Sequence, residues 1–362
     1  MDMEQEEKKV RVAITHGDTN GVGYELIFKT FAEQGMLELC MPIIYGSPKL
    51  ATFHRKMLNI PAQFTIISKA EDASDNKVNM LTCIEDEVKV DVGTHTPESE
   101  QAAQKAVDRA VEDYKNHLFD VLVTAPAANR HKQLSDGNDK GTLRMLIGER
   151  MMVGFATSQL PIKDVPGVIN TDLITDKLKT MHLTLKRDFR ITNPRIAVLA
   201  LNPQEDPDAP LSDEDLNAIY PAVEAMSNEN KLVFGPFSAD KFFGALAYEH
   251  YDAVLAMYYD QGAVPFFTIE GEKGVEYTAG TDIIHTSPDN DPDYPIAGQG
   301  KADEAPMRNA IYTAIDIFRN RANYDEAHEN PLPKLYHEKK DESEKVRFAI
   351  PKKKEPDANK EE

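Results

Sequence analysis

Cysteine, long apolar runs and basic charge are all scarce in this sequence, and each shortage excludes a class of protein. Two cysteines in 362 residues, Cys40 and Cys83, are too few for a disulfide framework, which fits a reducing compartment, and they form no metal-ligand cluster. No stretch approaches the ~18 consecutive apolar residues of a membrane span. Because 61 acidic residues outnumber 41 basic ones, the net charge of −20 disfavours binding to nucleic acid. We therefore expect neither a nucleic-acid nor a membrane partner.

The remaining composition is that of an ordinary soluble protein. Hydrophobic residues make up 41% and charged residues 28%, and the length predicts about two domains. The opening residues, MDMEQEEKKV, show neither a secretion-signal nor a transit-peptide pattern, so we expect the protein in the cytoplasm. From Asn330 onward proline, lysine and glutamate dominate, which predicts a solvated charged tail over residues 338–362.

Short apolar runs alternate with amphipathic segments along the chain. Arg11–Thr15 and Asp120–Thr124 are predicted strands, and Tyr24–Gln34 and Glu98–Tyr114 are predicted helices. Further short strands are expected at Met151–Thr157, Arg195–Ala200 and Ala253–Met257. This alternation predicts an α/β fold whose ligand sites lie where strands end in polar or glycine-rich loops.

Glycines are concentrated in Gly17–Gly23 (GDTNGVG), between the first strand and its helix. The amides of such a turn can hold an anion at a helix N-terminus. The segment is nevertheless neither G-x-G-x-x-G nor G-x-x-x-x-G-K-[ST]. We favour the structural interpretation, in which the glycines permit a tight strand-to-helix turn with positive φ.

Five blocks carry a resemblance to a known family. They are Ile14–Gly23 (ITHGDTNGVG), Val121–Pro126 (VLVTAP), Arg195–Pro203 (RIAVLALNP), Gly235–Asp240 (GPFSAD) and Val254–Asp303. In order and spacing they resemble the 4-hydroxythreonine-4-phosphate dehydrogenase family of vitamin B6 (pyridoxine) biosynthesis, which is related to the isocitrate and isopropylmalate dehydrogenases. The resemblance implies NAD- and metal-dependent oxidation of 4-phosphohydroxy-L-threonine.

The same resemblance implies a two-domain α/β fold of the isocitrate/isopropylmalate dehydrogenase type, with the active-site cleft between the domains. Residues 1–126 and 303–337 would form the first domain and residues 127–302 the second. The family is dimeric, and its metal site takes ligands from both subunits. We therefore expect a homodimer.

The family's metal-binding histidines are replaced in this chain. They end the motifs T-T-H-L-P, L-N-P-H and M-Y-H-D-Q-G, and the matching positions here are Gln159, Gln204 and Tyr259. A glutamine amide and a neutral phenol are poor ligands for zinc-like ions. None of the ten histidines offers a replacement by spacing, and His16 and His285 are interpreted as isolated surface or cleft residues. The sequence predicts that no metal binds.

The substrate positions change in the same direction. Where the family has a lysine, an asparagine and an arginine, this chain has Phe267, Glu276 and His285. The segment Ala127–Leu146 is shorter than the family pattern and lacks its G-H-T. Glu276 is expected to repel a phosphate, so the family's contacts to a phosphorylated substrate are predicted to be lost.

The loop that meets the adenosine half of NAD in the family is also altered. Asn290 and Asp291 belong to a segment, NDPD, that replaces a small glycine-containing turn. Gly298 and Gly300 in the following IAGQG are retained, and we interpret them as serving turn geometry. NAD binding is therefore doubtful.

A few polar residues of the family pattern persist: Asn202, Asp240, Asp260 and Gln261. Asp240 and Asp260 could face the cleft as an acid/base pair. The favoured alternative is that they are scaffold acids held by local hydrogen bonds.

Three functional hypotheses remain. The favoured one is a degenerate dehydrogenase homologue with a binding or regulatory role, for example in a heterodimer with an intact relative. The second is a metal-independent enzyme acting on a different, less anionic ligand, with Phe266, Phe267, Tyr258 and Tyr259 forming an apolar cleft. The third is a working NAD-dependent 4-hydroxythreonine-4-phosphate dehydrogenase with atypical ligands.

Overall fold

The computed structural model describes residues 9–84, 88–128, 141–157, 160–204 and 211–330. Its strands are β1 Val10–Thr15, β2 Cys40–Gly46, β3 Thr65–Ile67, β4 Asn79–Thr82, β5 Val121–Thr124, β6 Leu143–Ile147, β7 Met152–Phe155, β8 Arg195–Leu199, β9 Leu232–Phe237, β10 Ala253–Ala256, β11 Val275–Ala279 and β12 His285–Pro288. The expected charged tail, residues 338–362, lies outside the described residues.

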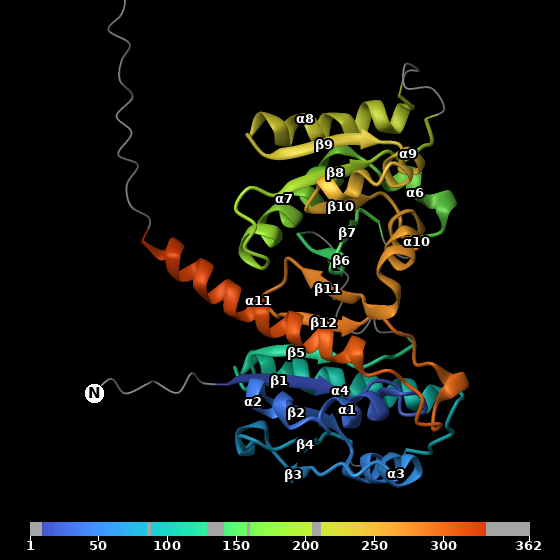
Figure 1. Cartoon of the computed structure of the whole chain (residues 1–362), viewed down its shortest axis with the longest axis vertical. Helices are drawn as coiled ribbons and strands as arrows, with labels where there is room; N and C mark the ends of the chain where they lie inside the picture. Colours follow the sequence, from blue (N-terminus) through green and yellow to red (C-terminus); the bar gives the residue numbers. More distant parts are fainter. Residues whose placement is uncertain (1–8, 85–87, 129–140, 158–159, 205–210, 331–362) are drawn as a thin grey trace, which may run out of the picture.

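Helices cover both faces of these strands (Figure 1). They are α1 Gly23–Thr30, α2 Gln34–Leu39, α3 Pro48–Leu58, α4 Pro97–Lys115, α6 Val165–Val168, α7 Thr171–Arg187, α8 Tyr220–Asn228, α9 Ala239–Gly244, α10 Tyr259–Glu270 and α11 Ala305–Glu329. Short helical turns lie at η1 Ala70–Asp72, η2 Ile162–Asp164, η3 Asp215–Ile219, η4 Ala247–His250, η5 Gly271–Lys273 and η6 Tyr294–Ile296. Among the described helices, none has the length and apolar character needed to cross a bilayer.

The strands form one mixed sheet in the order β3-β4-β2-β1-β5-β12-β11-β6-β7-β10-β8-β9. Both wings are parallel, as expected for strands joined through helices, and β1 pairs with β5 after the α4 crossover. The centre is antiparallel, because β11 pairs with β12 on one side and β6 on the other, and β6 pairs with β7. The α/β prediction is confirmed, while the predicted division into two domains stays a prediction.

The predicted elements agree with the observed ones except at one helix. Tyr24–Gln34 was expected to be continuous, but α1 ends at Thr30 and α2 begins at Gln34. Phe31 and Met36, on opposite sides of the break, are both buried in the core. In a continuous helix two residues five apart point about 140° away from each other, so the break allows both to face the same core.

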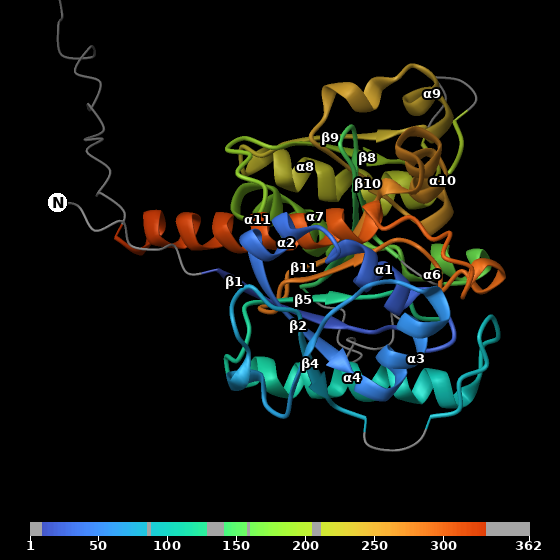
Figure 2. The ribbon, with the colours of Figure 1, turned by 60° about the horizontal axis from the view of Figure 1, so that its bottom comes forward.

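The two faces of the sheet differ in the middle. The face under α7 and α11 is mainly apolar, and Leu143, Met145 and Tyr277 of the central strands belong to its core. On the other face α4 packs against β1 and β2, and α10 packs against β7 and β10, so that two separate apolar clusters form. Figure 2 shows the first strands between α4 on one side and α1, α2 and α11 on the other. The stretch of sheet between the α4 and α10 clusters carries polar side chains.

Candidate functional site

A row of polar side chains crosses the central strands between the α4 and α10 clusters. Arg144 on β6 is the cross-strand partner of Thr278 on β11, which is in turn the partner of His285 on β12. Directly opposed residues lie on the same face of a sheet, as does Glu276, two residues before Thr278. We call Arg144, Glu276, Thr278 and His285 the polar row. It is the part of the sheet where a polar ligand would find matching groups.

Arg144 and Glu276 form an ion pair within this row. Nε of Arg144 lies 3.1 Å from Oε1 of Glu276, and Nη2 donates a 3.1 Å hydrogen bond to Oε2. Their side chains are only 12% and 7% exposed, so solvent screens the pair weakly. A phosphate at this place would meet the positive charge of Arg144 beside the negative charge of Glu276, and the expectation that Glu276 repels a phosphate stays a prediction. The signal for Arg144 in the sequence was a single charged residue inside the apolar run Leu143–Ile147.

Tyr259, at the start of α10, joins this pair to the α10 cluster. The Arg144 guanidinium lies over its ring, 4.6 Å from the centroid, and the ring also packs against Phe155 at 5.1 Å. One predicted metal position (Tyr259) and one predicted substrate position (Glu276) therefore meet at the same arginine. The sequence placed the two replacements in separate motifs and gave no sign of this contact.

The two histidines expected at the surface or in the cleft are buried instead. His285 is buried; its Nε2 hydrogen-bonds to the Thr124 hydroxyl at 2.9 Å, and its Nδ1 lies 3.4 Å from the Thr278 hydroxyl. His16 is fully buried, stacks on Tyr24, and both its ring nitrogens lack a hydrogen-bond partner among the described residues. Desolvation by burial lowers the pKa of His16 to about 4. His16 directly follows the buried strand β1, and His285 is the first residue of the buried strand β12.

The described metal positions do not suit a divalent cation. Tyr259 has the Arg144 guanidinium on its ring, and the ammonium of Lys241 donates a 2.7 Å hydrogen bond to the carbonyl oxygen of Gln204. Gln159 lies outside the described residues. Within the described ranges, no group of three or more His, Cys, Asp or Glu side chains is arranged to hold a metal. Arg144 and Lys241 are therefore positive charges next to two of the positions that would have to bind the metal cation.

Asn202 and Gln261 are held by the scaffold. The Asn202 amide donates to the Ser212 hydroxyl at 2.7 Å and to Glu214 at 3.1 Å, which fixes the loop after β8. Gln261 bridges two strand ends, since its Oε1 accepts from the Met257 amide and its Nε2 donates to the Ala200 carbonyl. Neither side chain is directed to the polar row by these bonds.

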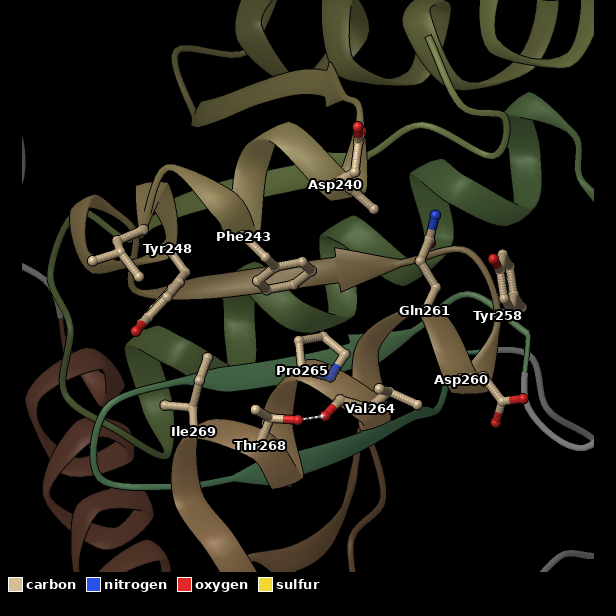
Figure 3. Close-up of a pocket in the computed structure, with 12 residues that line it drawn as sticks. Asp240, Phe243, Tyr248, Tyr258, Asp260, Gln261, Val264, Pro265, Thr268 and Ile269 are labelled. Atoms are coloured by element: carbon tan, nitrogen blue, oxygen red, sulfur yellow. Dashed lines mark hydrogen bonds between the residues drawn. The ribbon is translucent and has the colours of Figure 1, made fainter. Parts of the chain in front are cut away.

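Asp240 and Asp260 line one groove but do not form an acid/base pair. The groove lies between α9 and α10 and has a volume of about 530 Å³. Figure 3 shows the two carboxylates at separate places on its rim, pointing away from each other. The hydroxyl of Ser238 donates a hydrogen bond to Asp240 and lowers the pKa of that carboxyl. The interpretation of Asp240 as a scaffold acid held by a local hydrogen bond fits this geometry.

The apolar groove differs from the aromatic cleft that the sequence suggested. Phe266 is fully buried in the α10 cluster, and Phe267 packs edge-on against it with centroids 5.4 Å apart. Tyr258 lines the α9–α10 groove, whereas Tyr259 lies beside the polar row. The four aromatic residues therefore do not share one cavity wall.

The glycine-rich turn is closed by neighbouring backbone. Gly17 has φ +71°, and a side chain there would meet the Pro126 carbonyl oxygen at 2.4 Å. The Val22 amide, at the start of α1, donates to the Pro292 carbonyl at 3.0 Å, and Pro292 also packs on Gly21. The positive φ of Gly17 agrees with the structural interpretation, whereas Gly21 and Gly23 have no positive φ, and the Val22 amide already has an acceptor.

The altered dinucleotide loop lies directly on this turn. Asn290 is half-buried, Asp291 is exposed, and Tyr294 donates a 2.8 Å hydrogen bond to Oδ2 of Asp18 inside the turn. Gly298 and Gly300 have φ values of +77° and +69°, which agrees with their interpretation as turn glycines. Burial and the neighbouring Asp18 raise the pKa of Tyr294, so its phenol stays protonated and can donate. The sequence did not predict the Tyr294–Asp18 contact.

Comparison with known proteins places these features in context. The family model for the pyridoxal phosphate biosynthetic protein PdxA matches residues 38–314. A 4-hydroxythreonine-4-phosphate dehydrogenase of Bacteroides thetaiotaomicron is 44% identical over 358 residues, covering 95% of this chain and 98% of that protein. One from Prosthecochloris aestuarii is 31% identical over 334 residues, with 85% and 97% covered. A solved structure described as a putative 4-hydroxythreonine-4-phosphate dehydrogenase from Salmonella typhimurium has a TM-score of 0.72 at 25% identity, covering 86% of this chain and 100% of that one.

Proposed function

Because this chain belongs to the PdxA family of pyridoxal phosphate biosynthetic proteins, we propose that it binds a small ligand at the polar row without the family's metal-dependent oxidation of 4-phosphohydroxy-L-threonine. The role that fits is that of a homologue acting through binding. The chain is an α/β protein of the family fold, and its relatives span nearly its whole length.

The observation that carries the proposal is the charge at the described metal positions. Oxidation of a secondary alcohol by hydride transfer needs an electrophile to stabilise the alkoxide, and the family implies a divalent ion for this. The Arg144 guanidinium lies over the Tyr259 ring, and the Lys241 ammonium donates a hydrogen bond to the main-chain carbonyl of Gln204. Glu276 offsets part of the Arg144 charge, but both of its oxygens already face the guanidinium. A divalent ion placed here would meet like charge and few ligands.

A second candidate is a working NAD-dependent 4-hydroxythreonine-4-phosphate dehydrogenase with atypical ligands. The observation that favours it is the 44% identity, over 95% of this chain, to a protein named for that activity. Under this alternative the residues that stabilise the alkoxide would differ from the histidines of the family motif.

A turnover assay separates the two candidates. The purified full-length chain is incubated with NAD and 4-phosphohydroxy-L-threonine, with and without added zinc or manganese, and NADH is followed by absorbance. The Bacteroides thetaiotaomicron relative, assayed in parallel, controls for substrate quality. We expect no metal-dependent turnover by this chain. Turnover that a chelator abolishes and added metal restores would establish the second candidate.

A variant that restores the histidines tests the physical reason. Gln159→His, Gln204→His and Tyr259→His together return imidazoles to the three motif positions, and Tyr259→His also removes the ring on which Arg144 lies. If missing imidazole ligands are the reason that the wild type binds no metal, elemental analysis should find about one zinc or manganese per chain in this variant. Wild-type protein that carries stoichiometric metal would contradict the proposal directly.

A further inference from the structure

Arg144 is the cation of the polar row, and it is fixed from two directions. Glu276 holds one edge of the guanidinium at 3.1 Å, and the Tyr259 ring lies under its face at 4.6 Å. A guanidinium that is already oriented loses less conformational freedom when it binds an acceptor. The arrangement is therefore that of a prepared donor.

The ion pair uses only part of the guanidinium. Arginine has five N–H donors in a planar fork; Nη2 donates to Glu276, while Nε lies 3.1 Å from Oε1 of Glu276 and is enclosed without a hydrogen-bond partner. Nη1 has no hydrogen-bond acceptor in the part of the chain that the structure describes, and it is not fully enclosed by protein. The donors on Nη1 remain directed away from Glu276 and are available to an incoming acceptor.

We propose that Arg144 binds an anionic oxygen of a phosphate or carboxylate group on a small ligand that lies against the polar row. Planar donors of this kind match the two oxygens of such a group. Glu276 and Tyr259 orient the guanidinium, and Thr278 adds a hydroxyl in the same row. The proposal deepens the proposed function and rests on it for the location of the ligand. It also supplies an anion contact on β6, although Phe267, Glu276 and His285 have replaced the cationic and polar residues of the family motifs.

The charge of Glu276 makes the proposal sharply testable. If Arg144 served only to anchor the sheet, loss of either partner would disturb the pair in the same way. If Arg144 binds a ligand anion, Arg144→Gln removes the attracting charge, whereas Glu276→Gln removes a charge that opposes the ligand. The two substitutions should therefore change anion affinity in opposite directions.

Isothermal titration calorimetry of the full-length chain provides the measurement, with inorganic phosphate and L-malate as separate probes for the phosphate and carboxylate sources. We expect at least one probe to bind the wild type. Arg144→Gln should bind that probe at least about tenfold more weakly, as for a lost charge-assisted hydrogen bond. Glu276→Gln should bind it severalfold more tightly. The matched control is Arg150→Gln, which removes an arginine on the adjacent turn that pairs with Glu249 at the surface and should leave affinity within twofold. Circular dichroism of each variant checks that it is folded.

Three results would overturn the proposal: no binding of either probe to the wild type, equal weakening by Arg144→Gln and Arg150→Gln, or weakening by both Arg144→Gln and Glu276→Gln. The turnover assay gives an independent answer. Metal-dependent NADH formation would reject the proposed function while leaving the affinities, and hence the assignment of Arg144, to be judged on their own.

Discussion

The phenol of Tyr294 donates a 2.8 Å hydrogen bond to the buried carboxylate of Asp18, although 276 positions separate the two residues. Asp18 also accepts from the Ser99 hydroxyl at 3.0 Å and from the Asn20 amide at 2.8 Å. The bond therefore connects the loop after β12 to the glycine-rich turn and to the start of α4. A carboxylate enclosed in this way depends on each of its donors.

Tyr294→Phe should destabilise the protein, because it leaves one oxygen of a buried carboxylate with one donor fewer. We expect a loss of about 1–3 kcal/mol in the free energy of unfolding, measured by urea denaturation. Tyr312→Phe is the matched control, since among the described residues its hydroxyl hydrogen-bonds only to the Met36 sulfur, and Tyr312 is 38% exposed. Equal effects of the two substitutions would show that the Asp18 contact has no special weight.

The same contact bears on NAD. The loop that the resemblance assigns to the adenosine half of NAD is docked on the turn, and Asp291 and Asp293 are exposed beside it. Because their charge opposes the cofactor phosphates, we expect millimolar NAD to shift the melting temperature little. A site occupied at ~100 times its dissociation constant would add about 2.7 kcal/mol and a clear shift. A clear shift in the wild type that a Gly298→Val substitution abolishes would restore NAD as a ligand.

Most of the fold was predictable because it rests on local patterns. The strand at Val10–Thr15 and the helix at Pro97–Lys115 follow from apolar periodicity, and both were placed within about a residue. The break after Thr30 was missed because it depends on which core Phe31 and Met36 share, and that is a tertiary property.

The site was predictable only in part for the same reason. Motif comparison identified Gln204, Tyr259 and Glu276 as replaced positions, which needs only the order of residues. It could not show that Arg144, from a strand with no motif, contacts both Tyr259 and Glu276. The spacing of the histidines led to the interpretation of His16 as an isolated surface or cleft residue, whereas it is fully buried. Side-chain partners that come from distant strands are set by sheet register, which the sequence pattern does not give.

His16 should make the protein sensitive to mild acid. Its pKa is lowered from 6.5 to about 4 by burial, so between these values the unfolded state binds more protons than the folded state. Stability contributed by neutral His16 is complete above pH 6.5 and is lost as pH falls toward 4, by roughly 3 kcal/mol at most.

Urea denaturation from pH 7 to pH 4 measures this effect. His16→Phe should flatten the slope of stability against pH, while His250→Gln, at an exposed position, should keep the wild-type slope. The lowered pKa of His54 leaves a residual slope in both variants. An unchanged slope in His16→Phe would show that His16 is not held neutral.

We also propose that the chain forms a homodimer, which the resemblance implies, and the α9–α10 groove offers a surface for it. Leu246 and Val264 line it and are 53% and 61% exposed, and a groove with exposed apolar side chains is a feature of interaction surfaces. In a closed two-fold dimer the same patch is buried on both subunits, so one substitution acts twice.

Val264→Asp should therefore give a monomer, whereas Val168→Asp, at an exposed position on α6, should not. Light scattering at micromolar concentration decides the point: a wild-type mass near 40.5 kDa would remove the homodimer and, with it, a heterodimer formed through the same patch with an intact relative.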